Sequence, residues 1–326
     1  MGANTIIAYT RDYGIILVLG TFAFLFNILF SSQLRAEGDM KKATFSMASV
    51  DILNIIMDPI FIYTFHLGLK GAALATVLST IIPTIVSIYW LFIKKNTYLN
   101  YEISNFKFKP TLIRGILNVG VPASLEEFII SVVNMILNVL LVIVAGTNVI
   151  SAFNVNFSII QLGMMPCIAI GTSAITVAGV AYGAKEYEKV KITCHYGIKI
   201  SLIISLIITV LLFAFAPEIA LLFVDKSNME FYHLIIHVLR VTLLFLLVTP
   251  VGGVCAMVFQ AMGKGALSLL LTFIRELFLV ILIAYLIGIT LNFGLNGLLI
   301  GFILGLGIGS IISLIVIEGV YEKIVK

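Results

Sequence analysis

Three polar residues, Asp51, Asn54 and Asp58, interrupt an apolar stretch of sequence and are followed at once by Pro59. Their i, i+3, i+7 spacing places all three on one face of a helix. Two carboxylates and an amide oxygen are hard ligands that suit Na⁺ or a proton, and either cation would neutralise a buried charge. Proline disturbs the carbonyl of Ile55, which adds an oxygen beside Asp58. These residues predict a cation site, in preference to simple pairing with polar groups of neighbouring helices.

The composition defines the surroundings of this cluster. Of the 326 residues, 61% are hydrophobic and 11% are charged, whereas a soluble domain carries about 25% charged residues. These proportions exclude a water-soluble enzyme, a disordered chain and a nucleic-acid-binding protein. We therefore predict an integral membrane protein, in which a charged side chain at mid-bilayer costs about 3 kcal/mol and requires a function or a partner.

Runs of about 20 apolar residues are long enough to cross a bilayer as helices. Nine such runs predict an all-α, polytopic helical bundle. Five of the seven prolines fall inside the runs, which indicates kinked or locally opened helices. The predicted spans are 13–34, 43–65, 71–93, 114–144, 149–180, 192–216, 233–259, 268–289 and 297–319.

The positive charges are distributed unevenly between the two sides of the predicted bilayer. Loops after odd-numbered spans, the tail and Arg275, which lies two turns into the eighth span, together hold 15 of the 20 Lys and Arg residues, and the opposite side holds three. By the positive-inside rule, the C-terminus is cytoplasmic and the N-terminus external in a multi-pass protein of the plasma membrane. The other two cations, Lys199 and Arg240, lie inside spans and are expected to reach towards the membrane interface.

Two short motifs recur at a nearly constant distance along the chain. Residues 34–39 (LRAEGD) resemble 259–264 (FQAMGK), and residues 68–71 (GLKG) resemble 294–297 (GLNG), at offsets of 225 and 226. Six spans separate the copies, which predicts a parallel repeat of the kind found in two-lobed transporters. Two six-helix lobes require twelve spans, so three helices are expected to be missing at the front of the chain.

The repeat and the polar stretches together predict the organisation of the chain. Residues 1–93 are expected to form the last three helices of an N-terminal lobe, and residues 114–326 a six-helix C-terminal lobe. Residues 94–113, the longest polar stretch, are expected to be the cytoplasmic linker between them.

Further charged residues lie inside the predicted spans. Glu126 and Glu127 follow Pro122, and one of the two is a candidate cavity residue. Glu276 has Arg275 as its neighbour in sequence, which favours a structural ion pair at that position.

Other sequence signals favour packing over chemistry. The three cysteines are isolated and lack the spacing of a metal site or a disulfide framework. Gly301, Gly305 and Gly309 fit small-residue helix packing better than a nucleotide-binding loop. Because the sequence contains no P-loop, DNA-binding motif or catalytic triad, we predict no enzymatic activity, no ATP or nucleic-acid binding and no organic cofactor.

Several segments together resemble the multidrug and toxic compound extrusion (MATE) family, over essentially the whole chain. The resemblance implies twelve helices in two six-helix lobes, with drug efflux coupled to Na⁺ or H⁺ entry by alternating access. The segments match the fourth to eighth helices of the family in order and spacing: Tyr13, LRAEGD at 34–39, NIIMDP at 54–59, GLKGAALAT at 68–76, GVP at 120–122 and GVAYGA at 179–184.

The resemblance also implies which residues bind the coupling ion. In a prokaryotic branch with an N-terminal-lobe site, the family pattern places an Asn, an Asp and a Thr at Asn54, Asp58 and Thr76, with a tyrosine at Tyr13. Span seven lacks the Asp of the branch that uses a C-terminal-lobe site, which favours the N-terminal-lobe branch. The family's first helix supplies a further Asp and is absent here. Asp51 is added to the predicted site from its helical spacing.

The resulting hypothesis is a secondary antiporter in the lipid bilayer that exports amphipathic, often cationic organic compounds in exchange for Na⁺ or H⁺. Asn54 and Asp58 would be the metal ligands if the ion is Na⁺. One alternative is a lipid-linked oligosaccharide flippase of the same superfamily, although Lys199 and Arg240 are few cations for the basic cavity of such a protein. The other is a truncated membrane protein that does not transport.

Overall fold

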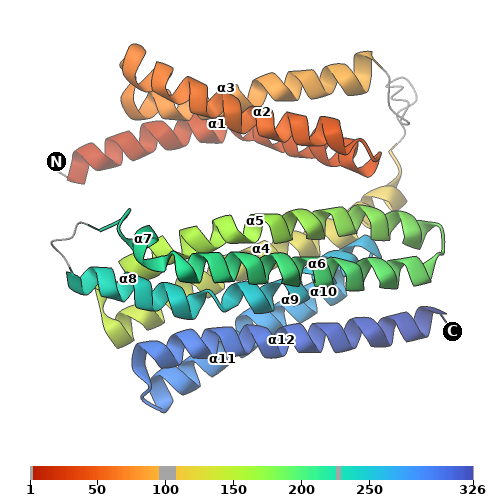
Figure 1. Cartoon of the computed structure of the whole chain (residues 1–326). Helices are drawn as coiled ribbons and strands as arrows, with labels where there is room; N and C mark the ends of the chain where they lie inside the picture. Colours follow the sequence, from red (N-terminus) through yellow and green to blue (C-terminus); the bar gives the residue numbers. More distant parts are fainter. Residues whose placement is uncertain (1–2, 95–107, 225–228, 326) are drawn as a thin grey trace. The chain divides into compact units, whose positions relative to one another are not determined.

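The computed structural model describes residues 3–94, 108–224 and 229–325. All regular elements in these ranges are helices (Figure 1), because a bilayer leaves no water to satisfy unpaired backbone groups. Nine helical stretches within them are long and apolar enough to cross a membrane, which confirms the predicted all-α polytopic fold. These stretches are Thr10–Ala36, Met40–Thr64, Gly68–Ile93, Pro110–Ala145, Val149–Gly183, Tyr187–Ala214, Met229–Ala261, Gly265–Thr290 and Gly294–Ile324.

The chain divides into two compact units, here called the N-unit (Met1–Phe108) and the C-unit (Lys109–Lys326). The boundary falls inside the predicted linker 94–113, of which residues 95–107 lie outside the described part of the chain. The last linker residues were assigned wrongly, since helix α4 already begins at Pro110. Proline is favoured in the first turn of a helix, where its missing amide hydrogen costs nothing.

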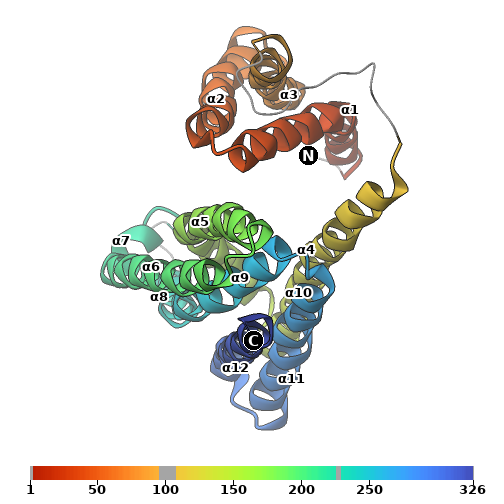
Figure 2. The ribbon, with the colours of Figure 1, turned by 90° about the vertical axis from the view of Figure 1, so that its right-hand side faces the viewer.

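The N-unit contains three long helices, of which α3 packs against both of the others. Small residues along α3, such as Gly71, Ala75 and Ser79, are buried and allow this close approach. Figure 2 shows the three helices nearly end-on. The elements are α1 (Ala3–Ala36), α2 (Met40–Pro59) with its π-helical continuation η1 (Ile60–Thr64), and α3 (Gly68–Ile88) with its π-helical continuation η2 (Tyr89–Ile93).

A buried hydroxyl cluster joins the three helices of the N-unit. Ser46 of α2 lies 2.9 Å from the hydroxyl of Ser87 in α3. On α1, Asn27 donates to the Ser46 hydroxyl at 3.4 Å, and Ser31 does so at the same distance. Such interhelical hydrogen bonds satisfy polar groups where water is absent and hold the helices in register.

The C-unit is built around α9, which packs against α5, α6 and α12. The predicted seventh span, 233–259, is broken into α8 and α9 by a turn at Leu243 and Leu244. The elements of the C-unit are α4 (Pro110–Ala145), α5 (Thr147–Gly183), α6 (Tyr187–Ala214), α7 (Ala216–Ala220), α8 (Met229–Thr242), α9 (Phe245–Ala261), α10 (Gly265–Thr272), η4 (Phe273–Leu279), α11 (Val280–Tyr285), η5 (Leu286–Thr290) and α12 (Gly294–Val325), where η marks π-helical turns.

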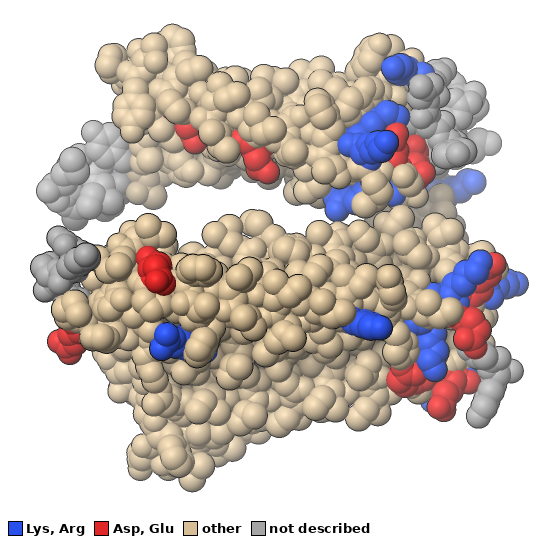
Figure 3. Space-filling view, viewed as in Figure 1, with Lys and Arg blue, Asp and Glu red and all other residues tan. Residues whose placement is uncertain are grey.

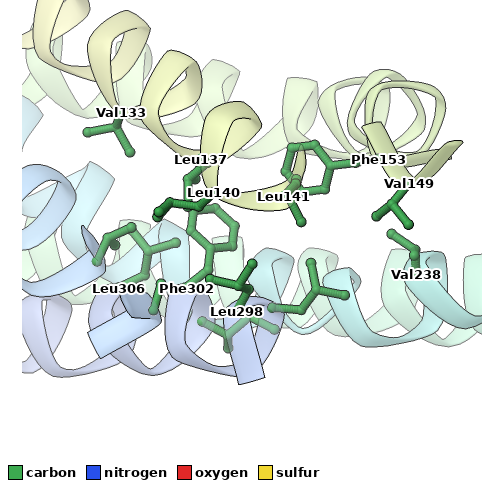
Figure 4. Packing of buried hydrophobic residues seen from close by; sticks show 14 residues of the cluster. Val133, Leu137, Leu140, Leu141, Val149, Phe153, Val238, Leu298, Phe302 and Leu306 are labelled. Atoms are coloured by element: carbon green, nitrogen blue, oxygen red, sulfur yellow. The ribbon is translucent and has the colours of Figure 1, made fainter. Parts of the chain in front are cut away.

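One apolar core of the C-unit lies between α4, α5 and α12 (Figure 4). Leu137 and Leu141 of α4 face Phe302 and Leu306 of α12, and Phe153 of α5 closes the cluster. All five side chains are buried, so the first and last helices of the C-unit are joined by apolar packing as well as by chain connection.

Glycines on α12 allow the close approach of the preceding helix. A methyl group at Gly301 would lie 2.5 Å from the Ala284 backbone, and one at Gly305 would lie 2.6 Å from the Val280 backbone. These residues therefore pack helix against helix, which confirms the interpretation of the four-residue glycine spacing as a packing motif.

The two predicted repeat motifs form the same local structures in both units. Gly38 and Gly263 both have positive φ (85° and 73°) and end their helices with matching backbone hydrogen bonds. At the second motif, the π-helical turns η1 and η5 end in His66 and Asn292, with φ of 55° and 56°. The repeat predicted from a few letters is therefore present in the backbone geometry.

Candidate functional site

Helices α2 and α3 bring together three of the predicted site residues. The Asn54 Nδ2 atom lies 3.4 Å from Asp58 Oδ1 on the next turn of α2, and 3.3 Å from Thr76 Oγ1 on α3. All three side chains are half-buried. Asn54 thus bridges a carboxylate and a hydroxyl group inside a predicted membrane span.

The Thr76 hydroxyl group is oriented by its own helix. It donates to the carbonyl of Ala72 at 2.9 Å, so its lone pairs point away from α3 and towards Asn54. Rotation of the Asn54 amide by 180° about χ2 would exchange its nitrogen for its oxygen at this position. The site would then present oxygens from Asn54, Asp58 and Thr76, a donor set that suits Na⁺ or a proton.

The other two predicted members are not joined to this group. Asp51 is exposed, and within the described residues it forms no hydrogen bond or ion pair with Asn54, Asp58 or Thr76. Tyr13 is half-buried on α1, and among the described residues no hydrogen bond links it to the three. Asp51 shares helix α2 with Asn54 and Asp58, and its side chain lies outside their hydrogen-bonded group.

Sequence reasoning missed a polar contact between α1 and α3. Asp12 forms an ion pair with Lys70 at 3.0 Å. At the corresponding repeat positions of the C-unit, His237 Nε2 lies 2.6 Å from Asn296 Oδ1. Asp12 precedes the first predicted span and Lys70 lies in the second repeat motif, so neither stands out in the sequence as a charge inside a span. Comparing the residues at matching offsets would have found both contacts.

A second polar centre lies in the C-unit around Glu126. This α4 residue is 7% exposed, and both of its carboxylate oxygens lie 3.4 Å from Gln260 Nε2 of α9. Thr272 of α10 donates to it at 3.3 Å. Glu127 is exposed. Of the two candidate glutamates, the structure therefore buries Glu126 in a junction of three helices.

Arg275 and Glu276 form the local ion pair expected from their sequence. Arg275 Nη2 lies 3.0 Å from Glu276 Oε1, and Nε lies 3.1 Å from the same oxygen. Both residues are buried within η4. The Arg275 charge is therefore matched by its own neighbour, and Glu126 is surrounded mainly by neutral donors.

Comparison of the sequence with models of known protein families shows which family the chain belongs to. A model of the MatE family matches residues 2–60 and 122–286, more than half of the chain. The chain belongs to the MatE family. The resemblance stated from the motifs is thereby confirmed, and the match includes both Asn54 and Asp58.

Relatives of this MatE protein are multidrug exporters by name. It is 30% identical over 260 residues to the multidrug export protein MepA of Staphylococcus haemolyticus, covering 79% of this chain and 56% of MepA. It is 25% identical over 223 residues to the probable multidrug resistance protein NorM of Thermotoga maritima, covering 67% and 47%. The chain spans about half the length of the curated relatives it matches.

Solved structures of the family share the fold. An outward-facing multidrug resistance MATE family transporter of the MOP superfamily superimposes with a TM-score of 0.93 and 33% identity, over 97% of this chain and 70% of that one. A MOP superfamily transporter from Pyrococcus furiosus gives a TM-score of 0.94 with the same identity and coverage. These matches show that the chain shares the fold of multi-pass membrane transporters.

Proposed function

We propose that this MatE protein acts in secondary antiport, exporting amphipathic, often cationic organic compounds in exchange for Na⁺ or H⁺. The observation that carries the proposal is the Asn54–Asp58–Thr76 group, in which Asn54 lies 3.4 Å from Asp58 and 3.3 Å from Thr76. The names of its relatives, which are multidrug export and resistance proteins, support the substrate class.

Asp58 would bind the coupling cation and Asn54 and Thr76 would complete its coordination. A carboxylate inside the bilayer costs about 3 kcal/mol, and a bound proton or Na⁺ removes that cost. Occupation can shift a conformational equilibrium only if the cation binds one state more tightly than the other. The coupling therefore requires the three residues to come together differently in the two states.

The charge distribution supports an orientation for this transport. The loops after odd-numbered predicted spans, the tail and Arg275 hold 15 of the 20 Lys and Arg residues. We place the protein in the plasma membrane with a cytoplasmic C-terminus, so that the external cation enters as the organic compound leaves.

Substitution Asp58→Asn tests the proposal, because it keeps the shape of the side chain and removes its charge. Cells expressing the variant should lose export of a fluorescent cationic dye, and proteoliposomes should lose efflux driven by an imposed Na⁺ or pH gradient. Comparing the two gradients in the wild-type protein identifies the ion. A parallel Asp51→Asn variant measures whether the exposed carboxylate contributes.

The matched control is Glu218→Gln, an exposed carboxylate of α7 with no assigned role. It should export the dye as the wild type does at equal expression. Gradient-driven efflux that is equal in wild type and Asp58→Asn would overturn the assignment of Asp58.

A further inference from the structure

Three cations lie well inside spanning helices, and they differ in how the protein accommodates them: Arg275 is paired with Glu276, whereas Arg240 and Lys199 have no carboxylate partner among the described residues. The guanidinium of Arg240 on α8 lies 4.8 Å from the centre of the Phe213 ring, a favourable cation–π contact. Lys199 on α6 is exposed, and within the described part of the chain it has no hydrogen bond, ion pair or ring contact. A counter-charge for Lys199 must therefore come from outside these residues.

The position of Lys199 along α6 matches the edge of a bilayer. The chain carries no charge from Ile200 to Ala216, and the 15 of these residues that lie in α6 correspond to about 22 Å of helix. The hydrocarbon core is about 30 Å thick. If this apolar run crosses the core, Lys199 lies at the boundary where phospholipid phosphates begin, on the side predicted to be cytoplasmic.

Lys199 lies at one end of a hollow on the surface of α6. The hollow has a volume of about 440 Å³ and is lined by residues of one helical face: Glu188, Lys191, Ile192, His195, Tyr196 and Lys199. Ile192 and Tyr196 are more than 60% exposed. The surface thus combines apolar and aromatic groups, which suit lipid chains, with cationic groups that suit a phosphate.

The nearest acid on the neighbouring helix is already neutralised. Glu318 of α12 lies 3.2 Å from Lys191 Nζ and 2.6 Å from His195 Nε2. These contacts hold two lining residues in place and take up the Glu318 charge. Glu188 lies in the first turn of α6, three turns away from Lys199 towards the predicted cytoplasmic side. The bilayer end of the hollow therefore keeps a net positive charge.

We propose that this face of α6 binds the headgroup of an anionic phospholipid, with its phosphate at Lys199 and Tyr196. Basic pockets on the cytoplasmic side of membrane helices suit anionic lipid headgroups, and each lysine near the surface contributes about 1 kcal/mol. The site belongs to the C-unit, whereas Asn54, Asp58 and Thr76 belong to the N-unit, and the inference does not depend on the transport proposal.

The test uses the whole chain purified in detergent. Phosphatidylglycerol should raise the melting temperature, and native mass spectrometry should show bound lipid, to a greater extent than with phosphatidylcholine. The substitution Lys199→Met should weaken phosphatidylglycerol binding about fivefold, the ratio that 1 kcal/mol represents. Lys199→Arg should restore binding, since the charge is retained.

The matched control is Arg240→Met, which removes another in-span cation, and it should leave the phosphatidylglycerol effect unchanged. Inorganic phosphate alone should give no shift, because only a lipid occupies the apolar part of the hollow. Equal effects of the two lipids, an unchanged lipid effect in Lys199→Met, or an equal shift with inorganic phosphate would each overturn the proposal.

Discussion

Asp58 and Glu126 are both carboxylates inside membrane spans, and they differ in burial and in the hydrogen bonds that they accept. Asp58 is half-buried and accepts one long hydrogen bond from Asn54 at 3.4 Å. Glu126 is 7% exposed and has donors from Gln260 and Thr272 on two other helices. Asp58 therefore keeps lone pairs for a cation, whereas Glu126 is positioned to join helices.

Removing the acceptor groups of Glu126 should destabilise the C-unit. In Glu126→Leu, the amide of Gln260 and the hydroxyl of Thr272 lose their acceptor in a buried position, so the free energy of unfolding should fall by about 1–3 kcal/mol. Glu126→Gln retains an acceptor and should lose less. Denaturant unfolding in detergent measures the difference.

Glu127→Leu is the matched control for this prediction, because the neighbouring side chain is exposed. It should change stability by less than about 0.5 kcal/mol. An equal effect of the two leucine substitutions would show that the hydrogen bonds of Glu126 do not stabilise the junction.

Among the helices, α2 has a well-defined start. Asp39 caps it by accepting a hydrogen bond from the Lys42 amide at 3.1 Å, and its other oxygen lies 2.6 Å from Lys42 Nζ. The hydrogen bond with the Lys42 side chain holds the pKa of the Asp39 carboxyl below its ordinary value. The same residue ends the turn that recurs in the C-unit, where Lys264 replaces it.

Substitution Asp39→Ala should lower the free energy of unfolding by about 1 kcal/mol at neutral pH, the usual value of a helix cap. Because the folded-state pKa is lowered, this contribution is present above about pH 4 and is lost as the pH falls through the folded-state pKa. Thermal unfolding of both proteins across this range measures the change. Asp39→Asn, which still caps, should behave like the wild type at neutral pH.

The two repeat offsets differ by one residue, and the structure shows where that residue goes. Between the equivalent turns, the C-unit contains the π-helical segment η4 (Phe273–Leu279), whereas α2 runs as an α-helix from Met40 to Pro59. A π-helical turn takes up one more residue than an α-helical turn. The change of offset from 225 to 226 therefore reflects one additional residue, which the π-helical segment accommodates without breaking the helix. Arg275 and Glu276 lie within η4.

At the scale of the whole molecule, charge is confined to limited regions. On the face seen in Figure 3, the Lys and Arg side chains of the C-unit gather mainly at one end, while most of its length is uncharged. Many large apolar side chains are exposed on those sides, such as Leu206, Ile207 and Ile315. This surface is suited to lipid, not water.

The two ends of α12 should therefore lie on opposite sides of the membrane. Phe293→Cys, in the exposed turn before α12, should react with a membrane-impermeant maleimide in intact cells, and Lys323→Cys should react only after the cells are opened. The three native cysteines are buried and should give little background. Labelling of both sites in intact cells would contradict the predicted orientation.

The sequence by itself determined the membrane fold, the spans, the repeat and the Asn54–Asp58 pair. Apolar run length, charge asymmetry and i, i+4 spacing are local properties that a linear chain records directly. Only the tertiary structure decided that Thr76 lies within hydrogen-bond distance of Asn54, that Gln260 and Thr272 meet Glu126, and that the guanidinium of Arg240 lies over the Phe213 ring. Each of these depends on how one helix is rotated against another, which is fixed by packing between residues far apart in the chain.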